Sequence, residues 1–341
     1  MKKRNFKRNF IGCLIFGTLL IPTLVTNALA EAIVYEQNPD PVIFNKDITN
    51  KKQRPFIVDK KEYPFKSNWF KKDGVSMHYI DEGKGIPIVL THGNPDWSFL
   101  NRNIIKELSN EARLIAFDLP GFGFSDTPKN YNFTPQEHVE WVKALIHNHL
   151  KLDKFILVVQ DWGGPIGLTV ATDNPENILG LVISNTWAWE ANKSLKEFSQ
   201  LMKTPKMKKL VIENNQFADA LMSSILNEKS KNNKVITDAY KMPFPTPESR
   251  KGTLVFPHQI TDAKLWLDKL ETKLPLLADK PVEFIFGEKD PWLSDPATIA
   301  KWRSFYPNGN VQILANVNHY TQEDSPESFV FSLRRIIKEI K

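Results

Sequence analysis

Short apolar runs rich in β-branched and aromatic residues recur along the chain and predict β-strands. These runs are Val75–Ile80, Ile86–Leu90, Leu114–Phe117, Phe155–Val159, Leu179–Ile183, Val282–Phe286 and Val311–Leu314. Longer segments with helical spacing lie between most of them, for example residues 135–150. Alternating strands and helices predict an α/β fold with a mostly parallel sheet that helices cover on both faces. The first two runs are too close for a crossover helix, so we expect an antiparallel start.

One interval breaks this alternation, because roughly a hundred residues separate the fifth run from the sixth, far more than one crossover needs. Helical spacing recurs inside it, and residues 242–247 are rich in proline. We therefore predict a helical cap over residues 187–260, inserted into a core formed by residues 63–186 and 261–341. Ligands of such sheets bind at the carboxyl ends of the strands, so the residues that follow the apolar runs are the candidates for chemistry.

Composition and charge narrow the class of protein. The chain has 341 residues, of which 41% are hydrophobic and 25% charged, and this excludes collagen-like, low-complexity and largely disordered proteins. The net charge is +6, but residues 1–30 hold five basic side chains and no acidic one. Without that segment 40 basic residues face 39 acidic ones, so nothing in the body of the protein indicates a nucleic-acid partner.

The N-terminal segment has the order of a secretory signal peptide. A basic stretch precedes an apolar run over residues 10–25, and Ala28-Leu29-Ala30 then predicts cleavage after Ala30. We expect an exported protein, periplasmic or secreted, without stable membrane association after cleavage. The alternative is an uncleaved segment that anchors the chain in a membrane. Residues 31–62 are polar and predict an irregular leader, and the single cysteine, Cys13, lies within the signal.

The sharpest chemical signal follows the run at residues 155–159 and reads Val158-Val159-Gln160-Asp161-Trp162-Gly163-Gly164. A strand followed at once by a small-residue turn and a helix is the setting of a nucleophile elbow. The central side chain is that of Asp161, and a carboxylate there can attack carbon without a base to activate it. The alternative is a structural role in which Asp161 caps the following helix.

Other strand ends complete a catalytic pattern. Asp290 follows the run at residues 282–286, and His319 follows the final run, which gives the nucleophile–acid–histidine order of an α/β-hydrolase triad. The backbone N–H groups of Asn94 and Trp162 are candidate donors to an oxyanion. The glycine-rich stretch over residues 117–125 lacks the features of a phosphate-binding loop and is interpreted as structural. No metal or cofactor pattern is present, because four of the histidines, His92, His138, His147 and His149, form no ligand set with carboxylates.

Together these residues resemble the haloalkane dehalogenases, from about Lys61 to the C-terminus. The matching stretches are His92-Gly93-Asn94-Pro95, Asp118-Leu119-Pro120-Gly121-Phe122-Gly123-Phe124-Ser125, Gln160-Asp161-Trp162-Gly163-Gly164, His319-Tyr320-Thr321-Gln322-Glu323-Asp324 and, in the predicted cap, residues 239–247 followed by Phe256-Pro257. The resemblance implies an α/β-hydrolase fold with an eight-stranded sheet and a cap after the sixth strand. It also implies that Asp161 displaces halide, that Asn94 and Trp162 bind it, and that Asp290 is the acid of the subgroup with an Asp-His-Asp triad. Asp96 departs from the family, which usually has Thr there.

The implied reaction is hydrolysis of a small halogenated alkane by water to alcohol and halide, through an ester on Asp161 and without a cofactor. His319 would activate water against the ester, with Asp290 fixing its tautomer. Epoxide hydrolases share the elbow and the cap, and they need cap tyrosines, for which Tyr240 is a candidate. A non-catalytic ligand-binding protein with this fold is a further alternative. Glu190 is a second candidate for the acid.

Overall fold

The computed structural model describes residues 54–341 of the chain. The predicted signal peptide and residues 31–53 of the predicted leader lie outside the described residues. Residues 54–62 form neither helix nor strand, in line with an irregular leader. Phe56 and Val58 from this segment are nevertheless buried, because Phe56 packs against the rings of Trp97 and Phe124.

Eight strands form one sheet in the order β1-β2-β4-β3-β5-β6-β7-β8. They are β1 (Asn68–Lys72), β2 (Val75–Gly83), β3 (Pro87–Leu90), β4 (Arg113–Phe117), β5 (Phe155–Gln160), β6 (Ile178–Ser184), β7 (Val282–Gly287) and β8 (Asn310–Leu314). All pairs from β4 to β8 along this order are parallel. The central strands are buried along their whole length, as expected for a sheet covered on both faces. The predicted mostly parallel sheet is confirmed.

The sheet has the expected antiparallel start, but the first two predicted runs do not pair with each other. β2 is antiparallel, but its partners are β1 and β4, and β3 lies inside the sheet between the parallel strands β4 and β5. Two runs that are close in sequence can pair directly, or another strand can lie between them in the sheet. Here β4 lies between β2 and β3. β1 was not predicted at all, because its sequence Asn-Trp-Phe-Lys-Lys is polar and only Phe70 is buried on this edge.

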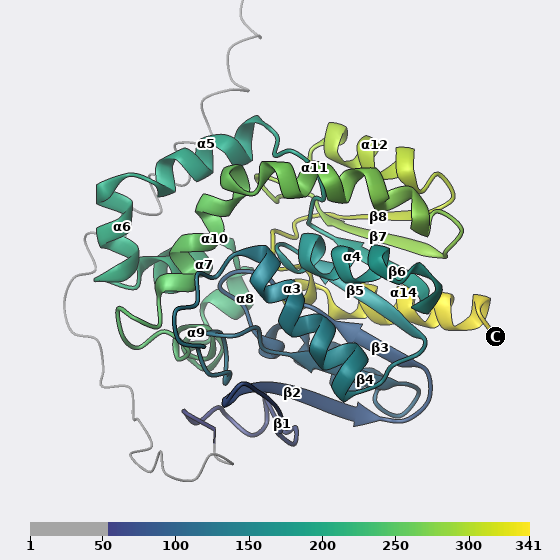
Figure 1. The fold of residues 1–341 in the computed structure, drawn as a ribbon, viewed down its shortest axis with the longest axis horizontal. Coiled ribbons are helices and arrows are strands. Elements are labelled where there is room, and N and C mark those ends of the chain that lie inside the picture. Colours follow the sequence, from purple (N-terminus) through teal and green to yellow (C-terminus); the bar gives the residue numbers. More distant parts are fainter. Residues whose placement is uncertain (1–53) are drawn as a thin grey trace, which may run out of the picture.

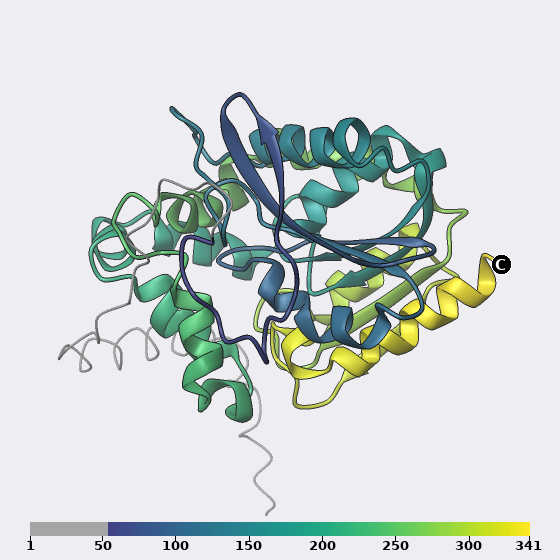
Figure 2. The ribbon, with the colours of Figure 1, turned by 90° about the horizontal axis from the view of Figure 1, so that it is seen from below.

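Helices cover both faces of the sheet (Figure 1). Figure 2 shows α3 and α4 on one side of the strands and α2 and α14 on the other. The helices outside the interval between β6 and β7 are α2 (Arg102–Leu108), α3 (Pro135–Lys143), α4 (Gly163–Asp173), α12 (Pro296–Phe305), α13 (Thr321–Asp324) and α14 (Pro326–Glu339). The shorter helical turns are η1 (Ser98–Asn101), η2 (Ala144–His149), η3 (Pro175–Asn177), η4 (Phe217–Leu221) and η5 (Leu274–Leu277).

Between β6 and β7 the chain forms a group of helices at one end of the sheet (Figure 1). They are α5 (Lys193–Met202), α6 (Pro205–Ile212), α7 (Met222–Ile225), α8 (Glu228–Lys231), α9 (Lys234–Lys241) and α10 (Lys251–Asp262). The last helix of the interval, α11 (Lys264–Lys273), packs on α4 instead. Asn or Thr side chains cap several of them; Asn192, for example, accepts the N–H of Leu195 at the start of α5. Among residues 54–341, no helix is both long and apolar enough to cross a membrane.

Candidate active site

Asp161 lies on a sharp turn between β5 and α4. Its φ of +47° is left-handed, a conformation that non-glycine residues adopt only where surrounding contacts hold them there. Here the backbone is held on both sides, since Asp161 N–H donates to Asn185 O at 3.0 Å and Asp161 O accepts from Gly164 N–H at 2.9 Å. The turn also needs small residues, because a Cβ on Gly164 would collide with Thr186 and one on Gly93 would collide with Asp161 itself.

The side chain of Asp161 points away from α4 and toward a histidine. Its Oδ1 accepts the backbone N–H of Asn94 at 2.8 Å, and its Oδ2 lies 3.5 Å from Nε2 of His319. Helix α4 has no side-chain cap. The helix-capping alternative for Asp161 is therefore wrong, and the carboxylate is available for chemistry.

His319 is buried between two carboxylates. Its Nδ1 lies 2.7 Å from Oδ2 of Asp290, whose Oδ1 accepts the backbone N–H groups of Trp292 at 2.8 Å and Leu293 at 3.1 Å. Burial disfavours the charged imidazole, but Asp290 and Asp161 outweigh it and raise the pKa of His319 to about 10. The histidine is consequently an imidazolium at neutral pH as long as Asp161 carries its charge.

Two amide side chains hold the loop of His319 in place. Nδ2 of Asn185 donates to the carbonyl oxygens of Asn318 and His319, each at 3.1 Å, and its Oδ1 accepts Gly287 N–H at 3.1 Å. Gln160 lies beside the imidazole, with its Nε2 3.0 Å from Nε2 of His319 and 3.3 Å from the carbonyl oxygen of that residue. These amides connect the ends of β5, β6 and β7 to the histidine loop.

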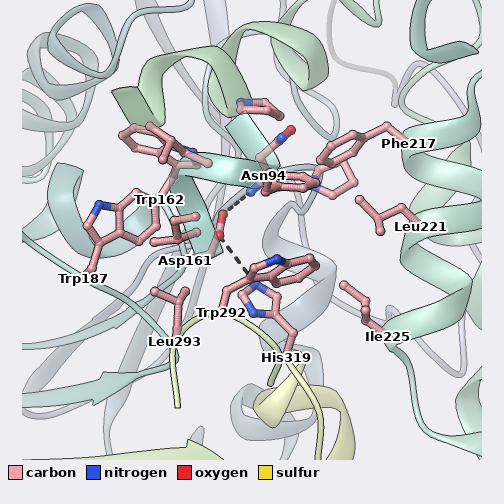
Figure 3. A pocket seen from close by; sticks show the side chains of 15 residues that line it. Asn94, Asp161, Trp162, Trp187, Phe217, Leu221, Ile225, Trp292, Leu293 and His319 are labelled. Atoms are coloured by element: carbon pink, nitrogen blue, oxygen red, sulfur yellow. Dashed lines mark hydrogen bonds and ion pairs between the residues drawn. The ribbon is translucent and has the colours of Figure 1, made fainter. Parts of the chain in front are cut away.

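Asn94 and Trp162 flank the nucleophile. Nδ2 of Asn94 donates one hydrogen to Thr253 O of α10 at 3.2 Å, which leaves its second hydrogen for another acceptor. The Trp162 ring packs between Trp187, at 4.9 Å between centroids, and Phe256, at 5.2 Å. The five residues singled out from the sequence therefore lie in one site, and Figure 3 shows four of them, all except Asp290.

An apolar pocket opens over Asp161 (Figure 3). Figure 3 shows Phe217, Leu221 and Ile225 facing Asp161 and His319 from the opposite wall. The full lining consists of Asn94, Pro95, Asp161, Trp162, Trp187, Leu195, Phe198, Phe217, Leu221, Ile225, Pro257, Ile260, Trp292, Leu293 and His319. Apart from the site residues, nearly all of these side chains are apolar. The pocket thus suits a small apolar substrate and excludes much of the solvent around the carboxylate.

The structure places the competing residues outside this pocket. Glu190 is exposed and forms ion pairs with Lys196 and Lys264, so it is not the acid beside His319. The hydroxyl of the buried Tyr240 donates to Glu323 at 2.8 Å. No tyrosine occurs among the lining residues in the described part of the chain.

The remaining sequence signals have structural roles. His92 is neutral, since burial lowers its pKa to about 4, and its Nε2 accepts Leu119 N–H at 2.9 Å. In the glycine-rich stretch, Asp118 accepts the backbone N–H groups of Ser98 and Phe124, each at 2.8 Å. Across residues 54–341, His, Cys, Asp and Glu side chains do not gather in threes that could hold a metal ion.

Sequence reasoning missed several residues around the site. The residues missed are Gln160, Asn185 and Trp187, which lie just after the ends of predicted strands. Their place after a strand is the signal in the sequence that could have indicated them. Their roles depend on contacts between strands that are distant in sequence.

Comparison with known proteins fits this geometry. The alpha/beta hydrolase fold family matches residues 86–326, and the chain belongs to it. Haloalkane dehalogenase 2 of Mycobacterium tuberculosis is 34% identical over 274 residues, which cover 80% of this chain and 95% of the relative. The chain is therefore a member of the haloalkane dehalogenase family.

Two further matches extend the comparison. The crystal structure of an ancestral haloalkane dehalogenase superposes with a TM-score of 0.72 at 27% identity, over 80% of this chain and 99% of the other. The cis-3-alkyl-4-alkyloxetan-2-one decarboxylase of Shewanella oneidensis is 30% identical over 285 residues, which cover 81% of this chain and 89% of the relative. Relatives of this chain thus carry two different named activities.

Proposed function

We propose that the protein hydrolyses small haloalkanes to alcohol and halide, through a covalent alkyl ester on Asp161. One observation carries the proposal above all: the carboxylate of Asp161, held on the elbow 3.5 Å from His319, faces an apolar pocket that Asn94 and Trp162 also line. Membership of the haloalkane dehalogenase family supports the same reaction.

In the first step the carboxylate of Asp161 attacks the carbon that bears the halogen. The C–O bond forms as the carbon–halogen bond breaks, and the halide leaves with the bonding electrons. An anion in an apolar pocket needs hydrogen-bond donors. The free amide hydrogen of Asn94 and the indole N–H of Trp162 are the groups we assign to it, and both residues line the pocket.

In the second step water hydrolyses the ester. His319 in its neutral form takes a proton from the water, whose oxygen attacks the ester carbonyl, and the alcohol leaves as the Asp161 carboxylate is restored. Asp290 holds Nδ1 of His319 at 2.7 Å, so Nε2 faces the ester. The backbone N–H of Asn94, already bound to Asp161 Oδ1, is placed to stabilise the oxyanion together with that of Trp162.

The test is halide release by purified residues 31–341 with 1-bromobutane and 1,2-dibromoethane. We expect bromide from the wild type and none from Asp161→Ala, whose folding is checked by circular dichroism. A folded wild type that releases no bromide from either compound would contradict the proposal.

A second candidate rests on the decarboxylase relative from Shewanella oneidensis, because its name gives an oxetanone as substrate. The same assay separates the two when a cis-3,4-dialkyloxetan-2-one is added and alkene is measured. Hydrolysis of epoxides has less support, since Tyr240 is bound to Glu323 and does not line the pocket.

A further inference from the structure

One carboxyl group beside the nucleophile has no part in the reaction described above. Asp96 lies two residues after Asn94 in the loop that follows β3, and none of its surface is exposed. The titratable groups that face it are Asp161 from the elbow, His319 and Tyr320 from the histidine loop, Glu323 from α13 and Tyr240 from α9. The site thus buries a third acidic residue close to the Asp161–His319–Asp290 triad.

The hydrogen bonds of these carboxyl groups differ sharply. Oδ1 of Asp290 accepts two backbone N–H groups, and Oδ1 of Asp161 accepts that of Asn94. Neither oxygen of Asp96 has a partner in ordinary hydrogen-bond geometry, and a looser contact with the Tyr320 hydroxyl favours its charged form only in part. A desolvated carboxylate with so weak a donor is far more costly than a neutral carboxylic acid in the same place.

Among the surrounding charges, Asp161 and Glu323 act in the same direction, and His319 opposes them. Asp161 and Asp290 share one imidazolium, and the carboxylate of Glu323 is already matched by the guanidinium of Arg102, at 2.7 Å between Oε1 and Nη2. A carboxylate at Asp96 would add an unmatched negative charge. Burial, followed by repulsion from Asp161, raises the pKa of Asp96 well above its ordinary value.

We propose that Asp96 is a positioning residue of this active site: its buried carboxyl keeps its proton and, as an uncharged group, links the loop of Asn94 to the loop of His319 through the Tyr320 hydroxyl. The inference rests on the proposed function, because it concerns the hydrolysis of the ester. Once Asp161 is esterified, His319 must release its proton before it can act as a base. A negative charge at Asp96 would stabilise the imidazolium and delay that release, whereas a neutral acid does not.

The protonation of Asp96 can be tested without any substrate. A group whose pKa is raised in the folded state destabilises the protein as the pH rises above its unfolded pKa, near 3.9 for Asp. Asp96→Asn removes this effect, so its melting temperature should rise relative to the wild type as the pH increases from 5, by about 2 °C per pH unit for as long as the folded wild type keeps the proton on Asp96. A difference that is constant between pH 5 and 8 would overturn the proposal.

Asp118→Asn is the matched control, because the pKa of Asp118 is shifted in the opposite direction to that of Asp96. The Asp118 carboxylate is also buried, but His78 and two backbone N–H groups outweigh burial and lower its pKa. The stability that this group contributes is complete above the unfolded pKa, so the control variant should melt below the wild type by an amount that does not change between pH 5 and 8.

The positioning role is tested by single-turnover kinetics with 1-bromobutane, in which alkylation and ester hydrolysis are followed separately by quenched-flow mass spectrometry. Asp96→Leu should slow ester hydrolysis about tenfold, the size of one lost hydrogen bond, and alkylation by less than about threefold. Asp96→Asn, which keeps a neutral hydrogen-bonding group, should slow hydrolysis less than Asp96→Leu does.

Hydrolysis by Asp96→Leu at the wild-type rate, or slower hydrolysis by Asp96→Asn than by Asp96→Leu, would overturn the positioning role. A wild type that forms no alkyl adduct with 1-bromobutane would instead contradict the proposed function, and with it the positioning role. The melting experiment would still decide whether Asp96 keeps its proton.

Discussion

Nε2 of His319 lies 3.5 Å from Oδ2 of Asp161, and both side chains line the apolar pocket (Figure 3). A substrate in the pocket would therefore lie beside the nucleophile and the histidine together. The histidine is placed to activate water against an ester on Asp161 and has no proton to remove from the carboxylate during alkylation. In the proposed reaction the nucleophile and the base act in different steps, so they can be separated by mutation.

His319→Phe should form the alkyl-enzyme but fail to hydrolyse it. The carboxylate attacks without help from a base, whereas the water needs one. After exposure to 1-bromobutane, the intact-mass spectrum should show one butyl group that persists for hours. Asp161→Ala is the control and should show no adduct. An unmodified His319→Phe protein would contradict the assignment of the two steps.

Hydrolysis of the ester should accelerate as the pH rises. The pKa of His319 is about 10 in the free enzyme because Asp290 and Asp161 outweigh burial, and esterification removes the charge of Asp161. The pKa of His319 in the alkyl-enzyme should consequently fall below 10, and the neutral base becomes more abundant at higher pH. Single-turnover decay of the butyl-enzyme between pH 6 and 9 measures this, and a rate that falls with pH would contradict it.

The convergence of the candidate catalytic residues could be predicted from sequence because each follows an apolar run that forms a parallel strand. In an α/β sheet such strand ends meet at one edge, so Asp161, Asp290 and His319 had to converge if the strands formed. The place of β3 in the sheet, on the far side of β4 from β2, could not be predicted. The length of the loop between β2 and β3 does not by itself decide which strand β3 pairs with. Nor could the role of Asn185 be predicted, because its contacts with Gly287 and the histidine loop exist only in the folded sheet.

Trp162→Phe should lower kcat/KM for bromoalkanes about a hundredfold, because it keeps most of the ring packing but removes one donor to the leaving halide. Trp187→Phe is the matched comparison. Its indole nitrogen is buried without a partner and points away from Asp161 in Figure 3, so a clearly smaller loss is expected. Steady-state kinetics and quenching of tryptophan fluorescence by bromide measure the effect. Equal losses in both variants would contradict halide binding by Trp162.

Asp290→Asn should lower turnover by about a thousandfold or more, since the imidazole loses its orienting carboxylate and the charge that stabilises the imidazolium. Alkylation should still occur, so bromide should appear as a single burst. Glu190→Gln is the control, because Glu190 pairs only with Lys196 and Lys264 among the described residues and should turn over normally. Normal turnover by Asp290→Asn would show that another residue is the acid.

The helices of the interval between β6 and β7 are fixed to the core by a buried ion pair close to the histidine loop. Nη2 of Arg102 in α2 lies 2.7 Å from Oε1 of Glu323 in α13. Glu323 also accepts hydrogen bonds from Ser230 in α8 at 3.1 Å and from Tyr240 in α9 at 2.8 Å. One carboxylate thus joins two helices of the interval to the segment that follows His319.

Glu323→Gln should lower the free energy of unfolding by about 3 kcal/mol at pH 7, because the buried guanidinium of Arg102 then keeps only the partly exposed Glu62, at 3.2 Å, as a matching charge. Burial raises the pKa of Glu323, but Arg102 outweighs burial and lowers it overall. The stability from this carboxylate is therefore present above its unfolded pKa and lost as the pH falls, so the difference between variant and wild type should shrink toward pH 4. Urea unfolding at both pH values measures this.

Arg334→Gln, which breaks the exposed pair with Glu111, should have no measurable effect at either pH. A loss in Glu323→Gln as small as in this control would show that the buried pair does not hold the helices to the core.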